Sequence, residues 1–412
     1  MTNQSQFSPH PPSCKLPSPP TRIGFLFNHD HLHQIPHGAP ILAELATLAD
    51  AHPEVELHAF ASGSERLAFL KKLLPTELHP KLHWHEISSP FWALTLDRLS
   101  GRAIPFERIG TLFKNRRVLT GMNVMVVPET TSLFLKEHFG GKDLRLIYTQ
   151  HGAGDRAVGF KPSIKKFDHV FVPGEKIRKR MLEAQIIRPD AFSEVGYPKF
   201  DLIDLTPTAP LFENDRPTIL YNPHCHPALS SWFRDGLRVL EFFYKHREYN
   251  LIVAPHVMLF ARRAHLSVSP WNLKFRGRIP KKYYNAPNIL IDTSSPACID
   301  MTYTRAADIY LGDASSQIYE FLYTPRPAIF LNSQNANWQN NPNFAHWKLG
   351  PVINQVHELH PLLKDQSWHP TQYAERQKNA FTATFGKSVK GGAKRAAQAV
   401  LDFANRPRPA VC

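Results

Sequence analysis

The 412-residue sequence contains only four cysteines and no long apolar run. No two cysteines form a CxxC pair, which leaves no basis for a disulfide framework or a zinc site of the cysteine type. No segment approaches the roughly 20 apolar residues that a helix needs to span a bilayer. Residues 1–20 are rich in Pro and Ser and lack the apolar stretch of a secretory signal. We therefore expect them to form a disordered leader on a cytoplasmic protein with reduced thiols.

Several patterns of metal and nucleic-acid binding are also absent. The chain has no HExxH, no zinc-finger spacing and no RNA-binding aromatic motif. We therefore expect no metal, no cofactor and no nucleic-acid partner. The chain does have 22 histidines, and four of them stand close together: His29, His31, His33 and His37. The sequence leaves open whether these four line a cleft or have no function.

The charge balance is strongly basic, with 49 Lys and Arg against 35 Asp and Glu, a formal net charge of +14. Such an excess suits phosphate-bearing substrates or an anionic membrane surface. Basic residues cluster in the predicted helix Phe106–Leu119 and in Lys176–Arg180. These clusters either contact anionic lipid or form ordinary solvated faces, and both interpretations stay open.

Predicted strands and helices alternate along most of the chain. Residues 21–205 contain apolar strands followed by helices, for example the strand Val55–Ala61 before the helix Glu65–Leu74. Residues 206–217 are rich in Pro and acidic residues and predict a linker. Residues 218–412 repeat the alternation and end in three helices. Because this pattern is typical of βαβ units, the sequence predicts an α/β protein with two Rossmann-like domains, 21–205 and 218–412, facing a cleft.

The segment Ala307–Asn332 is the clearest such unit. A short apolar strand is followed by the turn Gly312–Ser316, a helix and the strand Ala328–Leu331. Ser315 and Ser316 stand where the helix begins, and there a phosphate can accept hydrogen bonds from hydroxyls and free backbone N–H groups. The alternative is that Asp313 or one of the serines only caps the helix.

Other polar motifs follow predicted strands. His151 and Gly152 come directly after Leu144–Thr149, so His151 is placed as a general base at the edge of the sheet; the alternative is a histidine that closes a turn. Lys199 could reach a phosphate in the cleft, although its motif, Gly196–Asp201, also suits an interdomain hinge. In the second domain two strands are followed by imidazoles that could bind phosphate oxygens or protonate a leaving group, at His224 and His256.

Taken in order, these motifs resemble the CDP-glycerol glycerophosphotransferase family of teichoic-acid and capsule biosynthesis. The resemblance covers roughly residues 145–332 and rests on His151-Gly152, Gly196–Asp201, Tyr221-Asn222-Pro223, Pro255-His256 and Gly312–Glu320. It implies two Rossmann-like domains in the GT-B arrangement. The implied reaction transfers a polyol phosphate, glycerol phosphate first, from a CDP-activated donor to a hydroxyl acceptor and releases CMP. The implied acceptor is lipid-linked or a polysaccharide, on the inner face of the cell membrane.

The resemblance also implies roles for particular residues. His151 would remove the acceptor proton, and His256 would stabilise the departing phosphate. The implied donor-binding residues are Gly152, Lys199, Asp201, Asn222, His224, Asp313, Ser315, Ser316 and Glu320. Glu320 would accept hydrogen bonds from ribose hydroxyls, or it is a plain surface charge. Departures from the family pattern at Ala153, Lys199, His224, His226 and Val257 leave the donor open.

Two rival functions remain. One is another GT-B enzyme, either a nucleotide-sugar glycosyltransferase or a sugar-nucleotide 2-epimerase, which would release UDP rather than CMP. The other is a non-catalytic protein that binds nucleotides or polyanions in the cleft without turnover. The polyol, the acceptor, the number of units added and the oligomeric state are not determined by the sequence.

Overall fold

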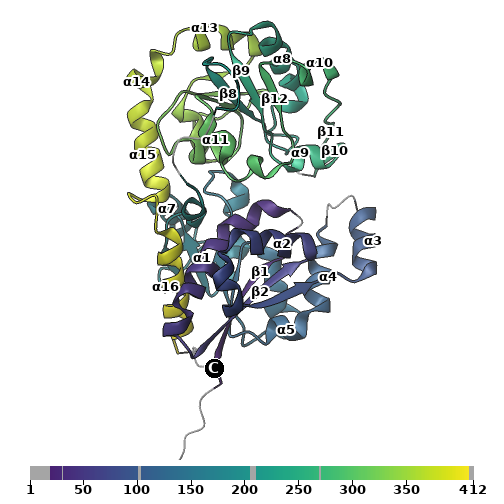
Figure 1. Ribbon diagram of the computed structural model, residues 1–412, viewed down its shortest axis with the longest axis vertical. Helices are drawn as coiled ribbons and strands as arrows, with labels where there is room; N and C mark the ends of the chain where they lie inside the picture. Colours follow the sequence, from purple (N-terminus) through teal and green to yellow (C-terminus); the bar gives the residue numbers. More distant parts are fainter. Residues whose placement is uncertain (1–18, 30, 101–103, 205–209, 269–270, 408–412) are drawn as a thin grey trace, which may run out of the picture.

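The computed structural model describes residues 19–29, 31–100, 104–204, 210–268 and 271–407. These form two α/β domains that lie one above the other (Figure 1). Most of the expected leader (residues 1–18) and residues 206–209 of the expected linker lie outside the described residues. Within the described ranges, no helix combines the length and apolar character that crossing a bilayer requires.

The first domain is built on a seven-stranded parallel sheet with the order β3-β2-β1-β4-β5-β6-β7. The strands are β1 Thr21–Phe27, β2 Val55–Ser62, β3 His83–Ile87, β4 Val124–Val127, β5 Arg145–Thr149, β6 His169–Val172 and β7 Phe192–Glu194. The helices are α1 Ile35–Leu48, α2 Ser64–Leu73, α3 Phe91–Leu99, α4 Phe106–Lys114, α5 Arg116–Thr120, α6 Phe134–Glu137 and α7 Glu175–Glu183. Both faces of the sheet are covered, which explains why its central strands read as continuous apolar runs.

The second domain has a six-stranded parallel sheet with the order β12-β9-β8-β13-β14-β15. Its strands are β8 Thr218–Asn222, β9 Asn250–Val253, β12 Ile289–Ile291, β13 Ile309–Gly312, β14 Ala328–Leu331 and β15 Val352–Ile353. Its helices are α8 Trp232–Lys245, α9 Met258–Ala261, α10 Lys281–Tyr284, α11 Thr302–Ala306, α12 Gln317–Phe321, α13 Leu359–Lys364, α14 Trp368–Gln372 and α15 Ala374–Phe385. A separate antiparallel hairpin, β10 Ala264–Val268 and β11 Trp271–Phe275, was not expected from the sequence.

The last helix, α16 Gly392–Ala404, returns to the first domain, as its yellow ribbon in Figure 1 shows. Ala396, Ala397 and Val400 are buried with α1 and β1 in one hydrophobic core, where small alanines permit close packing of the two helices. Arg145 donates hydrogen bonds to the carbonyl oxygens of Phe403 and Ala404, 3.0 and 2.8 Å away, at the end of α16. The expectation that all the terminal helices belong to the second domain was therefore wrong for α16.

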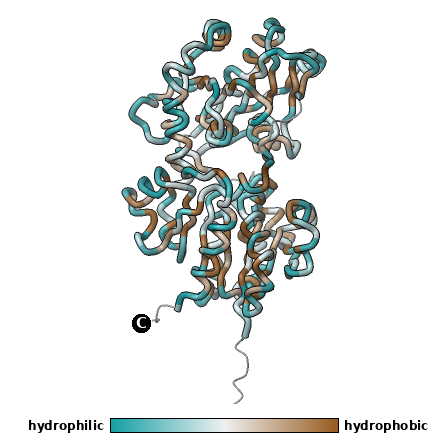
Figure 2. The backbone as a smooth tube through the Cα atoms, turned by 60° about the vertical axis from the view of Figure 1, so that its left-hand side comes forward, coloured by the Kyte–Doolittle hydropathy of each residue, from teal (hydrophilic) through white to brown (hydrophobic). Residues whose placement is uncertain are grey.

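Hydropathy follows this architecture, since apolar segments lie inside each domain and hydrophilic ones outside (Figure 2). All strands within each sheet are parallel, so their carboxyl ends share one edge. The loops that follow β5, β8, β9 and β13 meet in one pocket between the domains. The predicted α/β fold with two Rossmann-like domains facing a cleft is confirmed, and ligand sites of open α/β sheets lie at such strand ends.

Candidate active site

The pocket between the domains gathers eight of the residues that the sequence singled out. They are His151, Gly152, Lys199, His224, His256, Ser315, Ser316 and Glu320. The segment after β1 adds three histidines whose role the sequence left open: His29 and His33 precede α1, and His37 lies in its first turn. Three further predicted residues, Asp201, Asn222 and Asp313, do not line this pocket. The site is thus rich in imidazole and hydroxyl groups from both domains.

His151 follows β5 and is oriented by the backbone. Its Nδ1 lies 2.6 Å from the carbonyl oxygen of Pro128. Because a carbonyl only accepts, Nδ1 carries the hydrogen and Nε2 keeps its lone pair. Burial lowers the pKa of His151 to about 4, partly offset by the hydrogen bond to Pro128. The imidazole is therefore neutral near pH 7 and can accept a proton at Nε2.

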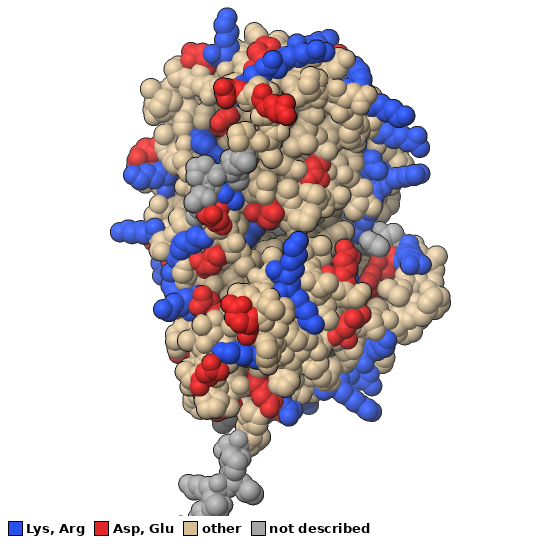
Figure 3. Space-filling model, viewed as in Figure 1, with Lys and Arg blue, Asp and Glu red and all other residues tan. Residues whose placement is uncertain are grey.

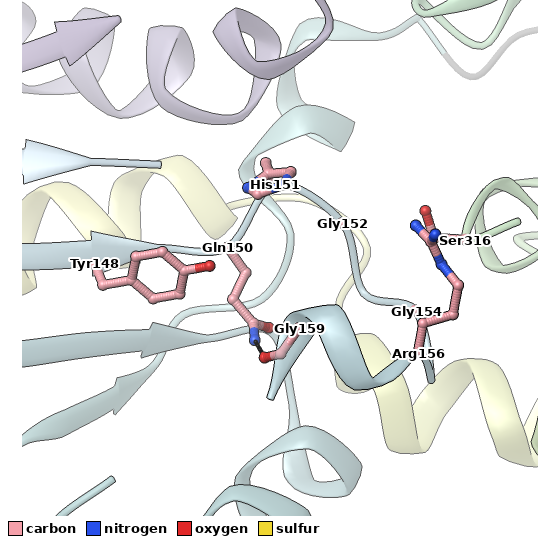
Figure 4. A pocket seen from close by; sticks show the side chains of 8 residues that line it. All are labelled: Tyr148, Gln150, His151, Gly152, Gly154, Arg156, Gly159 and Ser316. Atoms are coloured by element: carbon pink, nitrogen blue, oxygen red, sulfur yellow. Dashed lines mark hydrogen bonds between the residues drawn. The ribbon is translucent and has the colours of Figure 1, made fainter. Parts of the chain in front are cut away.

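The loop after His151 crosses to the second domain. Gly152 has φ +144°, and a Cβ there would lie 3.2 Å from Ser316 Oγ. A Cβ at Gly154 would lie 2.9 Å from Ser316 Cβ, so side chains are excluded where the loop meets the start of α12. Figure 4 shows His151 at one end of this loop and the side chain of Arg156 rising toward Ser316 at the other.

Arg156 is a site residue that the sequence analysis did not select. Its Nη1 lies 2.6 Å from Nε2 of His224, and it makes no ion pair with any carboxylate among the described residues. Burial lowers the pKa of this guanidinium, which nevertheless stays charged at neutral pH. A largely enclosed cation without a carboxylate partner favours the binding of an anion.

The contact between Arg156 and His224 supports the same conclusion. Nδ1 of His224 accepts a hydrogen bond from the backbone N–H of His226 at 2.9 Å. Its Nε2 faces the N–H of Arg156 at 2.6 Å, and a neutral imidazole accepts at only one of its two nitrogens, so one of these two donors lacks an acceptor. An anionic oxygen beside the two side chains would supply the missing acceptor.

His256 lies beside His224, with ring centroids 5.1 Å apart, and beside His33 at 5.7 Å. Its Nδ1 is 3.3 Å from the backbone N–H of Met258, which leaves the hydrogen on Nε2. Burial lowers the pKa of His256 to about 3. It is thus a neutral hydrogen-bond donor near pH 7 rather than an imidazolium.

Lys199 and Glu320 form a buried ion pair across the domain interface. Lys199 Nζ lies 2.8 Å from both carboxylate oxygens, and the hydroxyl of Tyr197 donates to Oε1 at 2.8 Å. Lys199 is 4% and Glu320 6% exposed, so Glu320 is not a plain surface charge. Because each charge already has its partner, the pair joins the domains and offers the pocket little free charge.

This pair leads to a first prediction. Lys199→Met should lower the free energy of unfolding by about 3–5 kcal/mol, because it leaves the Glu320 carboxylate buried without a counter-charge. Urea unfolding followed by circular dichroism measures the change. The double variant Lys199→Met/Glu320→Gln is the matched control and should recover most of the loss. A loss below about 1 kcal/mol in the single variant would contradict the buried pair.

The three residues outside the pocket hold loops in place. Asp313 accepts hydrogen bonds from the backbone N–H groups of His224 and Ser231, at 2.9 and 2.7 Å, and burial raises its pKa. Asn222 donates to the carbonyl oxygen of Ala254 at 2.6 Å. Asp201 accepts from the N–H groups of Gly391 and Ala393, both at 2.6 Å, at the start of α16. We therefore correct the prediction that these three bind the donor.

Ser315 and Ser316 remain at the pocket, but the helix after them is short. α12 has 5 residues, Gln317–Phe321, so its dipole is small. Ser315 Oγ lies 3.3 Å from the backbone N–H of Gln317, which agrees with the capping alternative for that serine. The side chain of Ser316 makes no capping hydrogen bond. Anion binding here would depend on hydroxyls and Arg156 more than on the helix.

Asp155 anchors the loop after His151 to the second domain, a role that no motif in the sequence predicted. Its carboxylate accepts from Lys176 Nζ at 2.8 Å, the Tyr319 hydroxyl at 2.6 Å and the backbone N–H of His346 at 2.9 Å. These partners hold the pKa of Asp155 below its usual range against the effect of burial. The anchor fixes the position of both His151 and Arg156.

Among the described residues, one group of side chains could hold a metal ion. The ligand atoms of His224, Cys225 and His256 lie within 4.8 Å of one another. However, the Arg156 guanidinium contacts His224, and burial raises the pKa of the Cys225 thiol to about 11. A neighbouring cation and a protonated thiol both disfavour a metal ion, so these residues fit an anion better.

Two parallel sheets with opposed strand ends and a last helix that returns to the first domain define the GT-B fold. The wall teichoic acid polymerase TagF, solved after a soak with CDPG, is similar with a TM-score of 0.57 at 17% identity, over 93% of this chain and 88% of that one. A UDP-N-acetylglucosamine 2-epimerase is similar with a TM-score of 0.58 at 11% identity, over 95% of this chain and 98% of that one.

A third similar structure is the UDP-GlcNAc 2-epimerase from Neisseria meningitidis bound to UDP-GlcNAc. Its TM-score is 0.55 at 13% identity, over 93% of this chain and 100% of that one. No protein-family profile matches the sequence, and no curated protein is similar to it. At sequence identities this low, the structural similarity shows the fold alone.

Proposed function

We propose that this protein transfers a polyol phosphate, most simply glycerol phosphate, from a CDP-activated donor to a hydroxyl acceptor. The observation that carries the proposal is the pairing of two kinds of group in one pocket. His151 offers a neutral, backbone-oriented Nε2, and Arg156, which has no ion-pair partner among the described residues, offers a positive charge beside the imidazoles of His224 and His256. A proton acceptor facing an anion site is what such a transfer requires.

In the proposed reaction an acceptor oxygen attacks the phosphorus that bears the polyol, and His151 Nε2 takes the proton from that oxygen. A new P–O bond forms while the bond to the bridging oxygen of the diphosphate breaks, and CMP leaves with both bonding electrons. Arg156, His224, His256 and the Ser316 hydroxyl stabilise the charge on the leaving phosphate. Positioning and electrostatic stabilisation of this kind need no covalent intermediate.

Three further residues support this arrangement. Gly152 has no side chain, which permits the donor phosphates to approach the backbone of the loop. Lys199 and Glu320 line the same pocket and hold its two walls together through their ion pair. The acceptor is proposed to be a lipid-linked or polysaccharide hydroxyl of a cell-envelope polymer such as teichoic acid or capsule.

The second candidate function is that of a nucleotide-sugar enzyme, either a glycosyltransferase or a 2-epimerase. It is favoured by the likeness in fold to a 2-epimerase bound to UDP-GlcNAc. An uncompensated arginine and neutral imidazoles suit the diphosphate of either kind of donor. The two functions therefore differ in the product rather than in the anion site.

The test is nucleotide release from CDP-glycerol, CDP-ribitol, UDP-sugars and CMP-sugars, each with crude membrane lipid as acceptor. We expect CMP from a CDP-polyol. Arg156→Gln should weaken donor binding by about ten- to a hundredfold, the effect of losing a hydrogen bond to a charged group, while the melting temperature stays within about 2 °C. Release of UDP would instead favour the second candidate function, that of a nucleotide-sugar enzyme. Tight nucleotide binding without any turnover would indicate a binding protein.

A further inference from the structure

Two surface elements present their apolar side to water. Of the large apolar side chains that are exposed among the described residues, most belong to α3 and the segment after it or to the hairpin β10–β11. Examples are Phe91 at 82%, Leu99 at 78%, Trp271 at 73% and Phe275 at 69% exposure. In Figure 1 both elements lie on the right-hand side of the molecule, one on each domain.

The hairpin exposes its apolar face to water, whereas an ordinary surface sheet exposes its polar face. In its antiparallel register Ala264 pairs with Phe275 and Leu266 with Leu273, so these side chains share one face. That face is exposed, with Leu266 at 46% and Leu273 at 49%. The opposite face carries His265 and Ser267, which are only 8% and 5% exposed and turn toward the domain. An outward apolar face of this kind calls for a covering partner.

Helix α3 also exposes its apolar side chains and buries a polar one. Phe91, Trp92, Leu96 and Leu99 recur at the spacing of one helical stripe, and all four are exposed. The polar residue Asp97 faces inward instead, where it accepts a hydrogen bond from the backbone N–H of Glu107 at 3.3 Å. The helix therefore buries a carboxylate and offers its apolar stripe to the outside.

Both elements are bordered by basic residues. Residues 249–291, which include the hairpin, contain seven Lys and Arg and no Asp or Glu. Exposed cations without a carboxylate partner among the described residues are Arg263, Lys274, Arg278 and Lys281 there, and Arg98, Lys114 and Arg117 near α3. Lys and Arg side chains project along the right-hand edge of the upper domain in Figure 3. By contrast, the cations of the predicted cluster Lys176–Arg180 in α7 have acceptors within the protein: Lys176 pairs with Asp155, Arg178 with Glu194 and Lys179 with Glu175, and Arg180 donates to the Asp155 carbonyl oxygen.

We propose that α3 and the hairpin β10–β11 together form a docking surface for an anionic lipid bilayer. Exposed Trp and Phe side chains among basic residues are the pattern that inserts at a lipid interface, and each Lys or Arg near such a surface adds to the attraction. A bilayer is broad enough to cover elements of both domains at once. Docking through both elements would hold the cleft beside the membrane, although this inference stands independently of the donor chemistry.

The experiment is vesicle flotation of the full chain without any donor. Wild type should bind vesicles that contain about 30% phosphatidylglycerol, and binding should fall with added salt and be lost on pure phosphatidylcholine. Trp271→Ser/Phe275→Ser and Phe91→Ser/Leu99→Ser should each weaken binding about tenfold or more, since each pair removes two interfacial anchors. Leu237→Ser, an exposed leucine of α8 at 45%, is the matched control and should bind as wild type does.

Two results would overturn the proposal. One is absence of wild-type binding to anionic vesicles. The other is a dimer in light scattering that Trp271→Ser/Phe275→Ser converts to a monomer, which would assign the hairpin to a second copy of the chain. Because all the substituted side chains are exposed, the variants should keep the melting temperature of wild type, and circular dichroism verifies this. Nucleotide release in detergent solution would report the proposed transfer separately, so failure of one proposal leaves the other measurable.

Discussion

His151→Asn is expected to reduce turnover by about a hundredfold to ten-thousandfold, the usual contribution of a general base. The asparagine amide can still donate to the Pro128 carbonyl oxygen, which now lies 2.6 Å from Nδ1. It has no counterpart of the Nε2 lone pair that would take the acceptor proton. Donor affinity and stability should therefore change little, and the loss should appear in kcat rather than in KM.

The measurement is CMP release at saturating donor, with donor affinity determined separately. His226→Asn serves as control, because His226 lies outside the pocket and its Nδ1 only accepts from Ala228, a role that asparagine can imitate. It should keep activity within about twofold of wild type. Since burial lowers the pKa of His151 to about 4, wild-type kcat/KM should be flat between pH 6 and 8. Activity of His151→Asn within threefold of wild type would refute the base assignment.

Strands buried on both faces were predictable because burial forces a continuous apolar run. The expected strand Val55–Ala61 is β2 Val55–Ser62, and Leu144–Thr149 is β5 Arg145–Thr149. Packing contacts between segments far apart in the sequence were not predictable. The amphipathic stripe of α16 indicates that the helix packs on something, but only the structure shows that it packs on α1. The long expected helix Phe106–Leu119 is divided into α4 and α5 at Asn115.

The same limit applies to the candidate site, where local patterns could be predicted from the sequence and distant contacts could not. Among the polar residues predicted at strand ends, those that face the gap between the domains, such as His151 and His256, do come together in one pocket, and their roles stay predictions. The selection was wrong for Asn222 and Asp313, because strand ends also leave backbone groups that nearby polar side chains must satisfy. Arg156 was missed since nothing local distinguishes it from other basic residues; its significance depends on a contact 68 residues away.

The stability of the fold should fall steeply as the pH is lowered from 6.5 to about 5.5, above the range in which ordinary carboxylates protonate. Burial is the main cause that lowers the pKa of His151 to about 4 and of His256 to about 3, and it also lowers the pKa of His33, His37 and His224. The folded state therefore binds fewer protons than the unfolded chain, in which these imidazoles titrate near 6.5. Their contribution is complete above pH 6.5 and is lost as the pH falls.

Each such histidine lowers the free energy of unfolding by about 1.4 kcal/mol per pH unit below 6.5, until the folded pKa is reached. Five of them would remove about 7 kcal/mol over one pH unit, comparable with the whole stability of a typical domain. The shifted carboxylate of Asp155 acts in the same direction but only below its ordinary pKa, outside this window. Urea unfolding at pH 7.5, 6.5 and 5.5 measures the slope.

His37→Gln offers a test of the assignment, because His37 is 4% exposed and its Nδ1 has no hydrogen-bond partner among the described residues. The variant should flatten the slope by about 1.4 kcal/mol per pH unit, whereas substitution of the exposed His138 should leave it unchanged. Stability that stays constant from pH 7.5 to 5.5 would show that water reaches these imidazoles. The imidazoles that line the pocket would then become charged as the pH falls below 6.5. Arg156 would no longer be the main positive charge of the site.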